Sequence, residues 1–295
     1  MIVVTTPTGQ IGRELLPYLL DSAEPIRVIA RDPSRLETTL TDRVEVVQGS
    51  HDDIDVVTRA FAGASSVLWV LPPDPETRSV EGHYLDFTWA ACDAIRAQDV
   101  RRVVAVSTLG RGADAGHLSA ALAMEELLIA TGTAIRVLRM PFFMENLLNQ
   151  MEAITTQGMF FLPNDADRKL ATVATRDVGA AAAGLLLDRS WDGQDSVPVV
   201  GSIDLSPNDM ADVMSEVLKR SVHFQQVPGQ GFKATMLQYG MSDAWAQGLV
   251  DMATAQNDGF YDAEPGGVHS TGPTTFRTWC EDVLKPAVEP PDARA

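Results

Sequence analysis

Apolar and polar positions alternate in blocks along the first half of the chain. Short apolar runs of strand length recur, and most precede a longer segment whose apolar residues repeat every three to four positions, as on one face of a helix. The predicted strands are Met1–Val4, Ile26–Ala30, Val44–Val47, Ser66–Val70, Arg102–Val106 and Ala134–Leu138, and the predicted helices are Gly12–Leu20, Ile54–Phe61, Val80–Ala97 and Leu118–Thr131. This alternation predicts an α/β fold of the Rossmann type, a doubly wound parallel sheet with helices on both faces.

The regular alternation loosens after Asn146. Three helical patterns then mix with two short strand patterns: helices at Thr175–Leu187, Pro207–Arg220 and Ser242–Gln256, and strands at Val197–Val200 and Val222–Val227. We therefore expect a sheet domain over residues 1–150. A smaller, mixed α/β lobe is expected over residues 151–295, with its late elements packing back on the first domain.

The first predicted strand leads through a glycine-containing turn into a helix. This arrangement aims free backbone N–H groups at a pyrophosphate, as in dinucleotide-binding proteins. Gly9 lets the backbone approach a phosphate, and Gly12 lets the helix pack closely on the sheet. Thr6 stands where a third glycine is usual, so an ordinary strand-to-helix turn is the alternative. The residues predicted to hold the diphosphate are Thr6, Thr8, Gly9, Gln10, Ile11 and Gly12.

The second predicted strand ends at the position that reads the adenosine ribose. An acidic residue there binds the 2′-hydroxyl of NAD, whereas a guanidinium binds the 2′-phosphate of NADP through charged hydrogen bonds. This chain has Arg31 at that position, with Arg35 four residues on, so NADP(H) is favoured over NAD(H). Asp32 could instead reach the ribose or neutralise one of these arginines, and both could be solvated loop charges.

Ligands of doubly wound sheets bind at the carboxyl ends of the strands, where the strand order reverses. The residues that follow the later strands are therefore further cofactor-binding candidates: Ser50, Leu71, Pro72, Ser107, Pro141 and Phe142.

Composition narrows the class of partner. The net charge of −17 over 295 residues argues against nucleic acid and anionic membrane, because their phosphates would be repelled over most of the surface. The two cysteines lie far apart and give no metal-ligand spacing. The chain opens directly on a strand pattern and contains no apolar stretch of membrane-spanning length. We expect a cytoplasmic protein without a metal site, either a monomer or a homodimer.

Several of these segments together resemble the NmrA-like family of atypical short-chain dehydrogenase/reductases. The family includes redox-sensing regulators and NADP-dependent quinone and isoflavone-type reductases. The matching segments are Thr8–Gly12, Ile29–Arg35, Gly49–Asp53, Val106–Ser107, Arg139–Asn146, Thr175–Gly179 and Pro273–Phe276. The resemblance implies a Rossmann fold and an NAD(P) cofactor. The chain departs from the family at Thr6, where a glycine is usual, and at Ser50, where an aspartate is common.

One catalytic pattern is missing from the sequence. Short-chain dehydrogenases that act on alcohols pair a tyrosine with a lysine four residues later, which lowers the pKa of the phenol. None of the four tyrosines has a lysine at that spacing: Tyr18, Tyr84, Tyr239 and Tyr261 are followed there by Ser22, Thr88, Asp243 and Pro265. Alcohol or ketone chemistry through such a pair is therefore not expected.

Two functions remain compatible with this absence. The first is reduction of a small, quinone-like aromatic substrate, because a quinone accepts hydride with little help from a protein acid. Such a reductase could serve the tailoring of a polyketide or another secondary metabolite, by reduction or by supporting oxygen-dependent hydroxylation of the reduced quinone. The second is a non-catalytic NAD(P) redox sensor that docks a partner protein.

Five residues are candidates for the reaction end of the site. His117 begins a predicted helix near the expected nicotinamide and could protonate a reduced carbonyl oxygen, although a polar helix-start residue is the alternative. Phe143 follows Phe142 after the sixth strand, and with Asn146 it suits a flat, oxygenated ring unless this segment only packs on the lobe. Tyr239 and Trp245 could line the opposite wall.

Overall fold

The larger part of the protein is a sheet domain, which we call the body. The computed structural model describes residues 1–112, 114–263 and 272–289. Within these ranges a seven-stranded sheet has the order β10-β6-β5-β4-β1-β2-β3, and every neighbouring pair is parallel. Its strands are β1 (Ile2–Val4), β2 (Ile26–Ala30), β3 (Glu45–Gln48), β4 (Ser66–Trp69), β5 (Arg102–Thr108), β6 (Ala134–Met140) and β10 (Gln194–Pro198). The predicted Rossmann-type α/β fold is confirmed.

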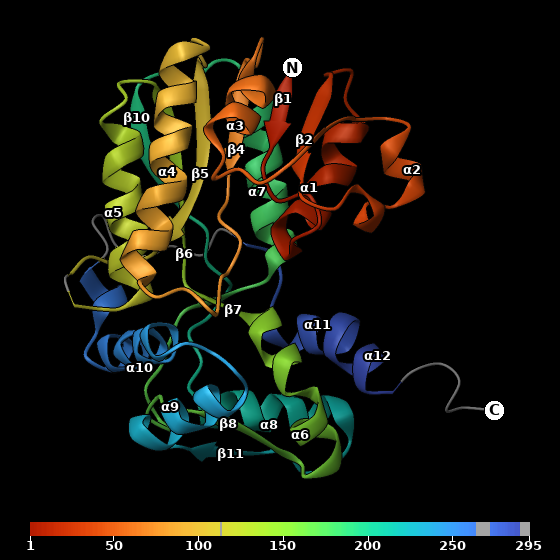
Figure 1. Cartoon of the computed structure of the whole chain (residues 1–295). Coiled ribbons are helices and arrows are strands. Elements are labelled where there is room, and N and C mark those ends of the chain that lie inside the picture. The colour runs from red at the N-terminus through yellow and green to blue at the C-terminus, as the bar shows by residue number, and fades with distance from the viewer. Residues whose placement is uncertain (113, 264–271, 290–295) are drawn as a thin grey trace.

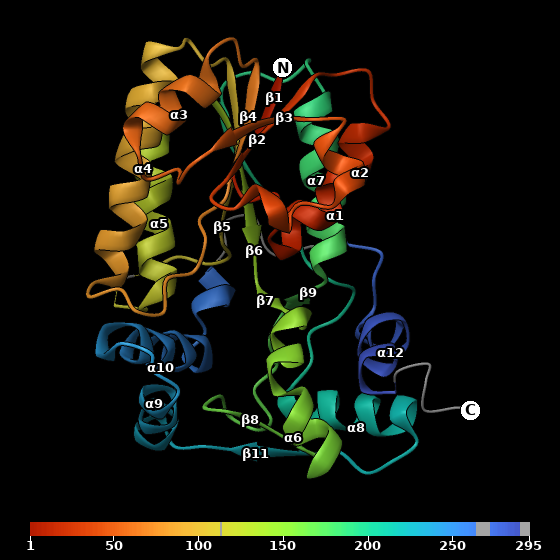
Figure 2. The same cartoon turned by 45° about the vertical axis from the view of Figure 1, so that its right-hand side comes forward.

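Helices cover both faces of this sheet (Figures 1 and 2). One face carries α1 (Gln10–Leu20) and α7 (Thr175–Leu187), and the other carries α3 (Ile54–Phe61), α4 (Val80–Ala97) and α5 (His117–Ile129). Between β2 and β3 lie a 3-10 turn, η1 (Pro33–Arg35), and the short helix α2 (Thr38–Thr41). Because both faces are covered, the central strands are mainly apolar rather than regularly alternating.

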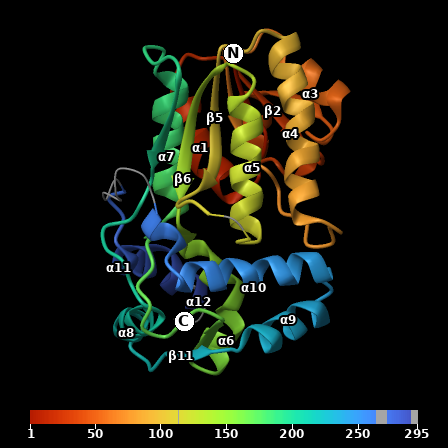
Figure 3. The same ribbon diagram turned by 90° about the vertical axis from the view of Figure 1, so that its left-hand side faces the viewer.

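The smaller part of the protein is a lobe below the carboxyl ends of the strands (Figures 1 and 3). Strands β7 (Phe142–Phe143) and β9 (Thr172–Val173) pair at the junction, and β8 (Met159–Leu162) pairs with β11 (His223–Gln226) inside the lobe. The other elements are η2 (Met144–Gln150), α6 (Met151–Thr156), α8 (Pro207–Leu218), α9 (Gly229–Gln238), α10 (Asp243–Asn257), η3 (Phe260–Ala263), α11 (Phe276–Trp279), the π-helical turn η4 (Cys280–Leu284) and α12 (Lys285–Val288). Phe160, Met214 and Trp279 are buried at the centre of the lobe.

Two elements of the second half belong to the body. The strand expected at Val197–Val200 in the lobe is β10, which begins at Gln194 and pairs with β6, Val197 opposite Leu138. The prediction was wrong because the first residues of this edge strand are polar and exposed, so no apolar pattern marks them. Helix α7 packs on α1, where a Cβ on Gly179 would lie 2.8 Å from the Cβ of Glu14. The chain therefore returns from the lobe to complete the body.

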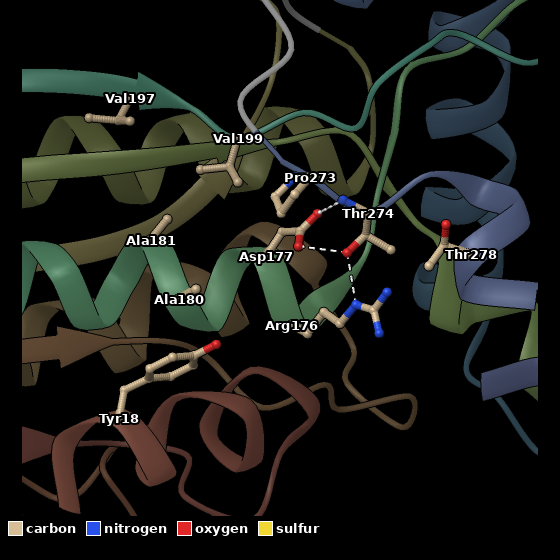
Figure 4. A pocket seen from close by; sticks show the side chains of 10 residues that line it. All are labelled: Tyr18, Arg176, Asp177, Ala180, Ala181, Val197, Val199, Pro273, Thr274 and Thr278. Carbon is tan, nitrogen blue, oxygen red and sulfur yellow. Dashed lines mark hydrogen bonds between the residues drawn. The ribbon is translucent and has the colours of Figure 1, made fainter. Parts of the chain in front are cut away.

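Buried polar contacts join the lobe to α7. The carboxylate of Glu145 is 7% exposed and accepts hydrogen bonds from Thr175 N and from Trp279 Nε1, each at 3.0 Å. Burial raises the pKa of this carboxyl above its ordinary value. Figure 4 shows the neighbouring contact, in which Asp177 accepts from the backbone N and the hydroxyl of Thr274, at 3.1 and 2.7 Å. A cavity of about 480 Å³ lies beside it, between α1, α7 and β10.

Among the described helices, none has the combination of length and apolar character that a bilayer span requires.

Candidate functional site

The site predicted from the sequence lies at the edge of the sheet that faces the lobe, which we call the cofactor edge. The strand order reverses between β1 and β4, so the connections after these two strands leave toward opposite faces and open a crevice there. The β1–α1 turn, Arg31, Ser50, Leu71 with Pro72, and Pro141 all follow strands that end at this edge. The fold thus brings together residues that are far apart in the sequence.

The β1–α1 turn presents an uncapped helix N-terminus. The N–H of Gly9 donates to Thr6 O at 3.1 Å, and α1 begins at Gln10 with no side chain capping its first amides. An uncapped N-terminus with its positive dipole end is suited to a phosphate. A Cβ on Gly9 would come no closer than 3.4 Å to other atoms, whereas one on Gly12 would lie 2.1 Å from Thr6 O. Gly12 is therefore required because α1 packs closely on the backbone of Thr6 and Pro7. Gly9 leaves open space in front of the first amides of α1.

Three arginines near this turn have exposed side chains: Arg13, Arg31 and Arg35. Within the part of the chain that the structure describes, their guanidinium groups form no hydrogen bond or ion pair. Asp32 neutralises none of them through a direct contact, because its carboxylate accepts from Ser34 N at 3.0 Å and Ser34 Oγ at 2.6 Å. These hydrogen bonds lower the pKa of Asp32. The arginines are free to meet an external anion.

Two buried histidines lie beneath the segment that follows β4. His51 Nε2 is 3.1 Å from Val70 O, and His83 Nε2 is 2.9 Å from Pro72 O. Both imidazoles are less than 10% exposed and have Phe87 between them, with ring centroids 4.9 and 4.8 Å from its ring. Burial lowers the pKa of His51 from 6.5 to about 4, so this ring is neutral at physiological pH. Ser50 and Leu71, both predicted to bind the cofactor, are half-buried beside them.

A buried ion pair between β6 and α5 lies at the half of the cofactor edge that β5 and β6 form. Arg139, near the end of β6, donates from Nε to Glu125 Oε2 of α5 at 3.4 Å, and its Nη2 bonds to Glu125 Oε1. Both side chains are about 95% buried, and the half-exposed Arg111 approaches the same carboxylate at 3.5 Å. Sequence reasoning missed this pair, although an acid on an apolar helix face and arginines within an apolar strand were visible signals.

The hydroxyl of Ser107, a predicted cofactor ligand, is directed at α5. It is buried and donates to Ala121 O at 3.3 Å. Its cofactor-binding role stays a prediction, and in this structure its hydroxyl already has a partner.

His117, the predicted catalytic residue, lies at the start of α5 beneath α10. Its side chain is 6% exposed, its Nε2 is 3.3 Å from Trp245 O, and its ring is 4.3 Å from the indole of Trp245. Burial lowers the pKa of His117. The two predicted residues thus contact each other and join α5 to α10. The catalytic role of His117 stays a prediction.

Phe142, predicted to bind the cofactor, and the remaining predicted substrate residues lie in different surroundings. Phe142 packs on the core of the lobe, whereas Phe143 packs on the core of the body, because successive side chains of β7 point to opposite faces. The two rings therefore lie on different cores, and the roles of Phe142 at the cofactor and Phe143 at the substrate stay predictions. Asn146 is exposed in η2, and Tyr239 is 76% exposed at the end of α9.

Within the described ranges, no cluster of three or more histidine, cysteine, aspartate or glutamate side chains could hold a metal ion.

Comparison with known proteins agrees with this architecture. The model of the NmrA-like family matches residues 1–275. The NAD(P)H azoreductase of Xenophilus azovorans is 24% identical over 254 residues, which cover 85% of this chain and 86% of that protein. The (4-alkanoyl-5-oxo-2,5-dihydrofuran-3-yl)methyl phosphate reductase of Streptomyces griseus is 29% identical over 265 residues, 88% of each chain. The structure of the NADPH-dependent quinone oxidoreductase QOR2 of Escherichia coli with NADPH has a TM-score of 0.77 at 21% identity, covering 94% of this chain and 97% of that chain.

Proposed function

The chain belongs to the NmrA-like family, and from this membership and the cofactor edge we propose that it is an NAD(P)H-dependent oxidoreductase that reduces a small, quinone-like aromatic substrate. The observation that carries the proposal is the β1–α1 turn, an uncapped helix N-terminus with open space at Gly9 and free arginines beside it. The three similar proteins are all named as reductases or oxidoreductases.

The residues present fit a dinucleotide. The first amides of α1, at Gln10, Ile11 and Gly12, would hold the diphosphate, because they need an acceptor and the helix supplies no side-chain cap. Arg31 and Arg35 would hold a 2′-phosphate, which makes NADPH the preferred form over NADH. The cofactor itself supplies the hydride.

The protein's part in the reaction is positioning. The described residues include no tyrosine with a lysine one helical turn later, and a quinone needs little protein acid because its reduced oxygen is a resonance-stabilised phenolate. Ser50, Leu71, Pro141 and Phe142 are proposed to orient the cofactor, and Phe143, Asn146, Tyr239 and Trp245 to contact the substrate as the lobe meets the body. A polyketide quinone stays the finer prediction within this class.

A titration tests the proposal. NADPH binding is measured first, and NADPH oxidation is then followed with a panel of quinones and azo compounds, against a control without protein. Gly9→Val is the matched control, because its Cβ fits the fold while its branched side chain enters the space in front of the amides. We expect turnover by the native protein and none by Gly9→Val.

Two results would contradict the reductase. Tight, unequal binding of NADPH and NADP⁺ without turnover on any acceptor would favour the redox-sensor alternative. Failure to bind either cofactor would refute both functions.

A further inference from the structure

The segment between β4 and α4, residues 70–79, runs from the cofactor edge to the lobe, and we call it the strap. It lies outside the regular strands and helices. Its Leu71-Pro72-Pro73 sequence also lacks two backbone N–H donors, so it can form few backbone hydrogen bonds of its own. The prolines favour extended backbone at the residues that precede them. A segment of this kind needs anchors supplied by other parts of the chain.

Side chains supply anchors at the upper end of the strap. The Thr5 hydroxyl accepts from Val70 N and donates to Val70 O, each at 3.0 Å, and His51 Nε2 meets the same carbonyl at 3.1 Å. Two residues later, His83 Nε2 meets Pro72 O at 2.9 Å. A carbonyl oxygen only accepts hydrogen bonds, so both rings carry their proton on Nε2.

The lower end of the strap is held by the lobe. Ser242, the residue that caps α10, donates from its backbone N to Pro75 O at 2.8 Å and from its hydroxyl to Thr77 O at 2.6 Å. The strap therefore has fixed points on both sides of Leu71, Pro72 and Pro73. The only titratable anchors among them are the two histidines, and neither is used by the proposed chemistry.

We infer that His51 and His83 are positioning residues for the cofactor: each donates its Nε2–H to one carbonyl of the strap, and together they hold Leu71 and Pro72 where the dinucleotide crosses the edge. This inference rests on the proposed function. The His51 ring packs against Trp69 and Phe87, and the His83 ring packs against Phe87, which fixes the direction of both rings before any ligand binds. Such preorganisation improves affinity, because the segment is already ordered and no ordering cost is paid when the cofactor binds.

Substitutions that separate the ring from its donor test the inference. His51→Phe and His83→Phe keep an aromatic ring of similar shape and remove the N–H. His51→Gln and His83→Gln place an amide N–H near the position of Nε2. His223→Phe is the control, because His223 is exposed on β11 in the lobe.

The dissociation constant for NADPH is measured by calorimetry on the full chain, together with thermal unfolding. We expect each Phe variant to raise Kd roughly 3- to 10-fold, the effect of one lost hydrogen bond. We expect the Gln variants and His223→Phe to stay within about twofold of the native Kd. At saturating NADPH, kcat with a quinone should be unchanged, because the substitutions are expected to weaken only the binding of the cofactor.

Several outcomes would overturn the inference. One is a folded Phe variant with native Kd. Another is a Gln variant as weak as its Phe counterpart, which would assign the effect to ring packing. If a Phe variant does not fold, His→Asn at the same position replaces it, because the shorter amide cannot reach the carbonyl. If the native protein binds NADPH and the variants are unaltered, only the positioning role fails; if it binds no cofactor, the proposed function fails with it.

Discussion

The arginine side chains in the two halves of the cofactor edge differ in their exposure and in their partners. At the ends of β1 and β2, Arg13, Arg31 and Arg35 are exposed and have no side-chain partner among the described residues. At the ends of β5 and β6, Arg139 is buried against Glu125, and Arg111 approaches the same carboxylate.

The difference separates exposed arginines that have no partner among the described residues from arginines that are used for structure. A chain with a net charge of −17 repels anions over most of its surface, so we expect the exposed arginines beside the β1–α1 turn to favour an anion there. The buried pair contributes little to net charge at the reaction end. We expect that end to favour a neutral, apolar ring, as the proposed substrate requires.

Breaking the buried pair should destabilise the protein most. Glu125→Gln leaves the Arg139 guanidinium buried without its carboxylate, and we expect a loss of about 3–5 kcal/mol in the free energy of unfolding. Denaturant unfolding measures it. The double change Glu125→Met with Arg139→Met should cost less than the single change, because no uncompensated charge stays buried. A single variant as stable as the native protein would show that this pair is not structural.

The buried, neutral His51 should make the free energy of unfolding depend on pH. The folded protein holds the pKa of His51 at about 4, against 6.5 when unfolded, so the unfolded chain binds more protons between these values. The contribution is complete above about pH 6.5 and is lost as pH falls toward 4, on the order of 3 kcal/mol in total. Unfolding curves across this window should be steeper in pH for the native protein than for His51→Gln. Equal slopes would contradict the assignment.

Removing a free arginine should affect one cofactor and leave stability unchanged. Arg31→Ala should weaken NADPH binding by roughly 1.5–3 kcal/mol, the range for hydrogen bonds to charged groups, with little change for NADH. Arg59→Ala is a suitable control, because Arg59 is exposed in the last turn of α3, at the opposite edge of the sheet. Equal weakening of both cofactors would exclude Arg31 as the reader of a 2′-phosphate.

The smallest effect on turnover is expected at His117. Its Nε2 already faces Trp245 O and its pKa is lowered by burial, so we expect His117→Phe to change kcat with a quinone by less than about threefold. A loss of about 10²–10⁴-fold, with the acid limb of the rate profile gone, would instead establish His117 as the general acid.

The regular part of the fold was predictable because it rests on local patterns. The helices at Ile54–Phe61, Val80–Ala97 and Thr175–Leu187 begin and end where the apolar periodicity placed them. Edge strand β10 was misplaced because its polar residues are ordered by pairing with β6, which is a long-range effect.

Only those residues of the candidate site that directly follow a strand could be predicted from the sequence. The turn at Gly9 and the position of Arg31 follow from the order of strand and helix. The anchoring roles of His51 and His83 depend on which carbonyls their rings meet, and no spacing in the sequence encodes those contacts. The divergence of Phe142 and Phe143 likewise follows from the two cores on either side of β7.

The return of α7 and β10 to the body has a consequence for biosynthesis. The apolar face of α1, with Leu15 and Leu19, shares one core with Val178 and Leu186 of α7. A nascent chain that has reached residue 150 lacks that partner and exposes the face until the ribosome has added about forty more residues, so the N-terminal half cannot close its core as it emerges. We therefore expect a fragment that ends between body and lobe not to fold alone, and a folded truncated form to extend through Pro198 and so include the first part of the lobe.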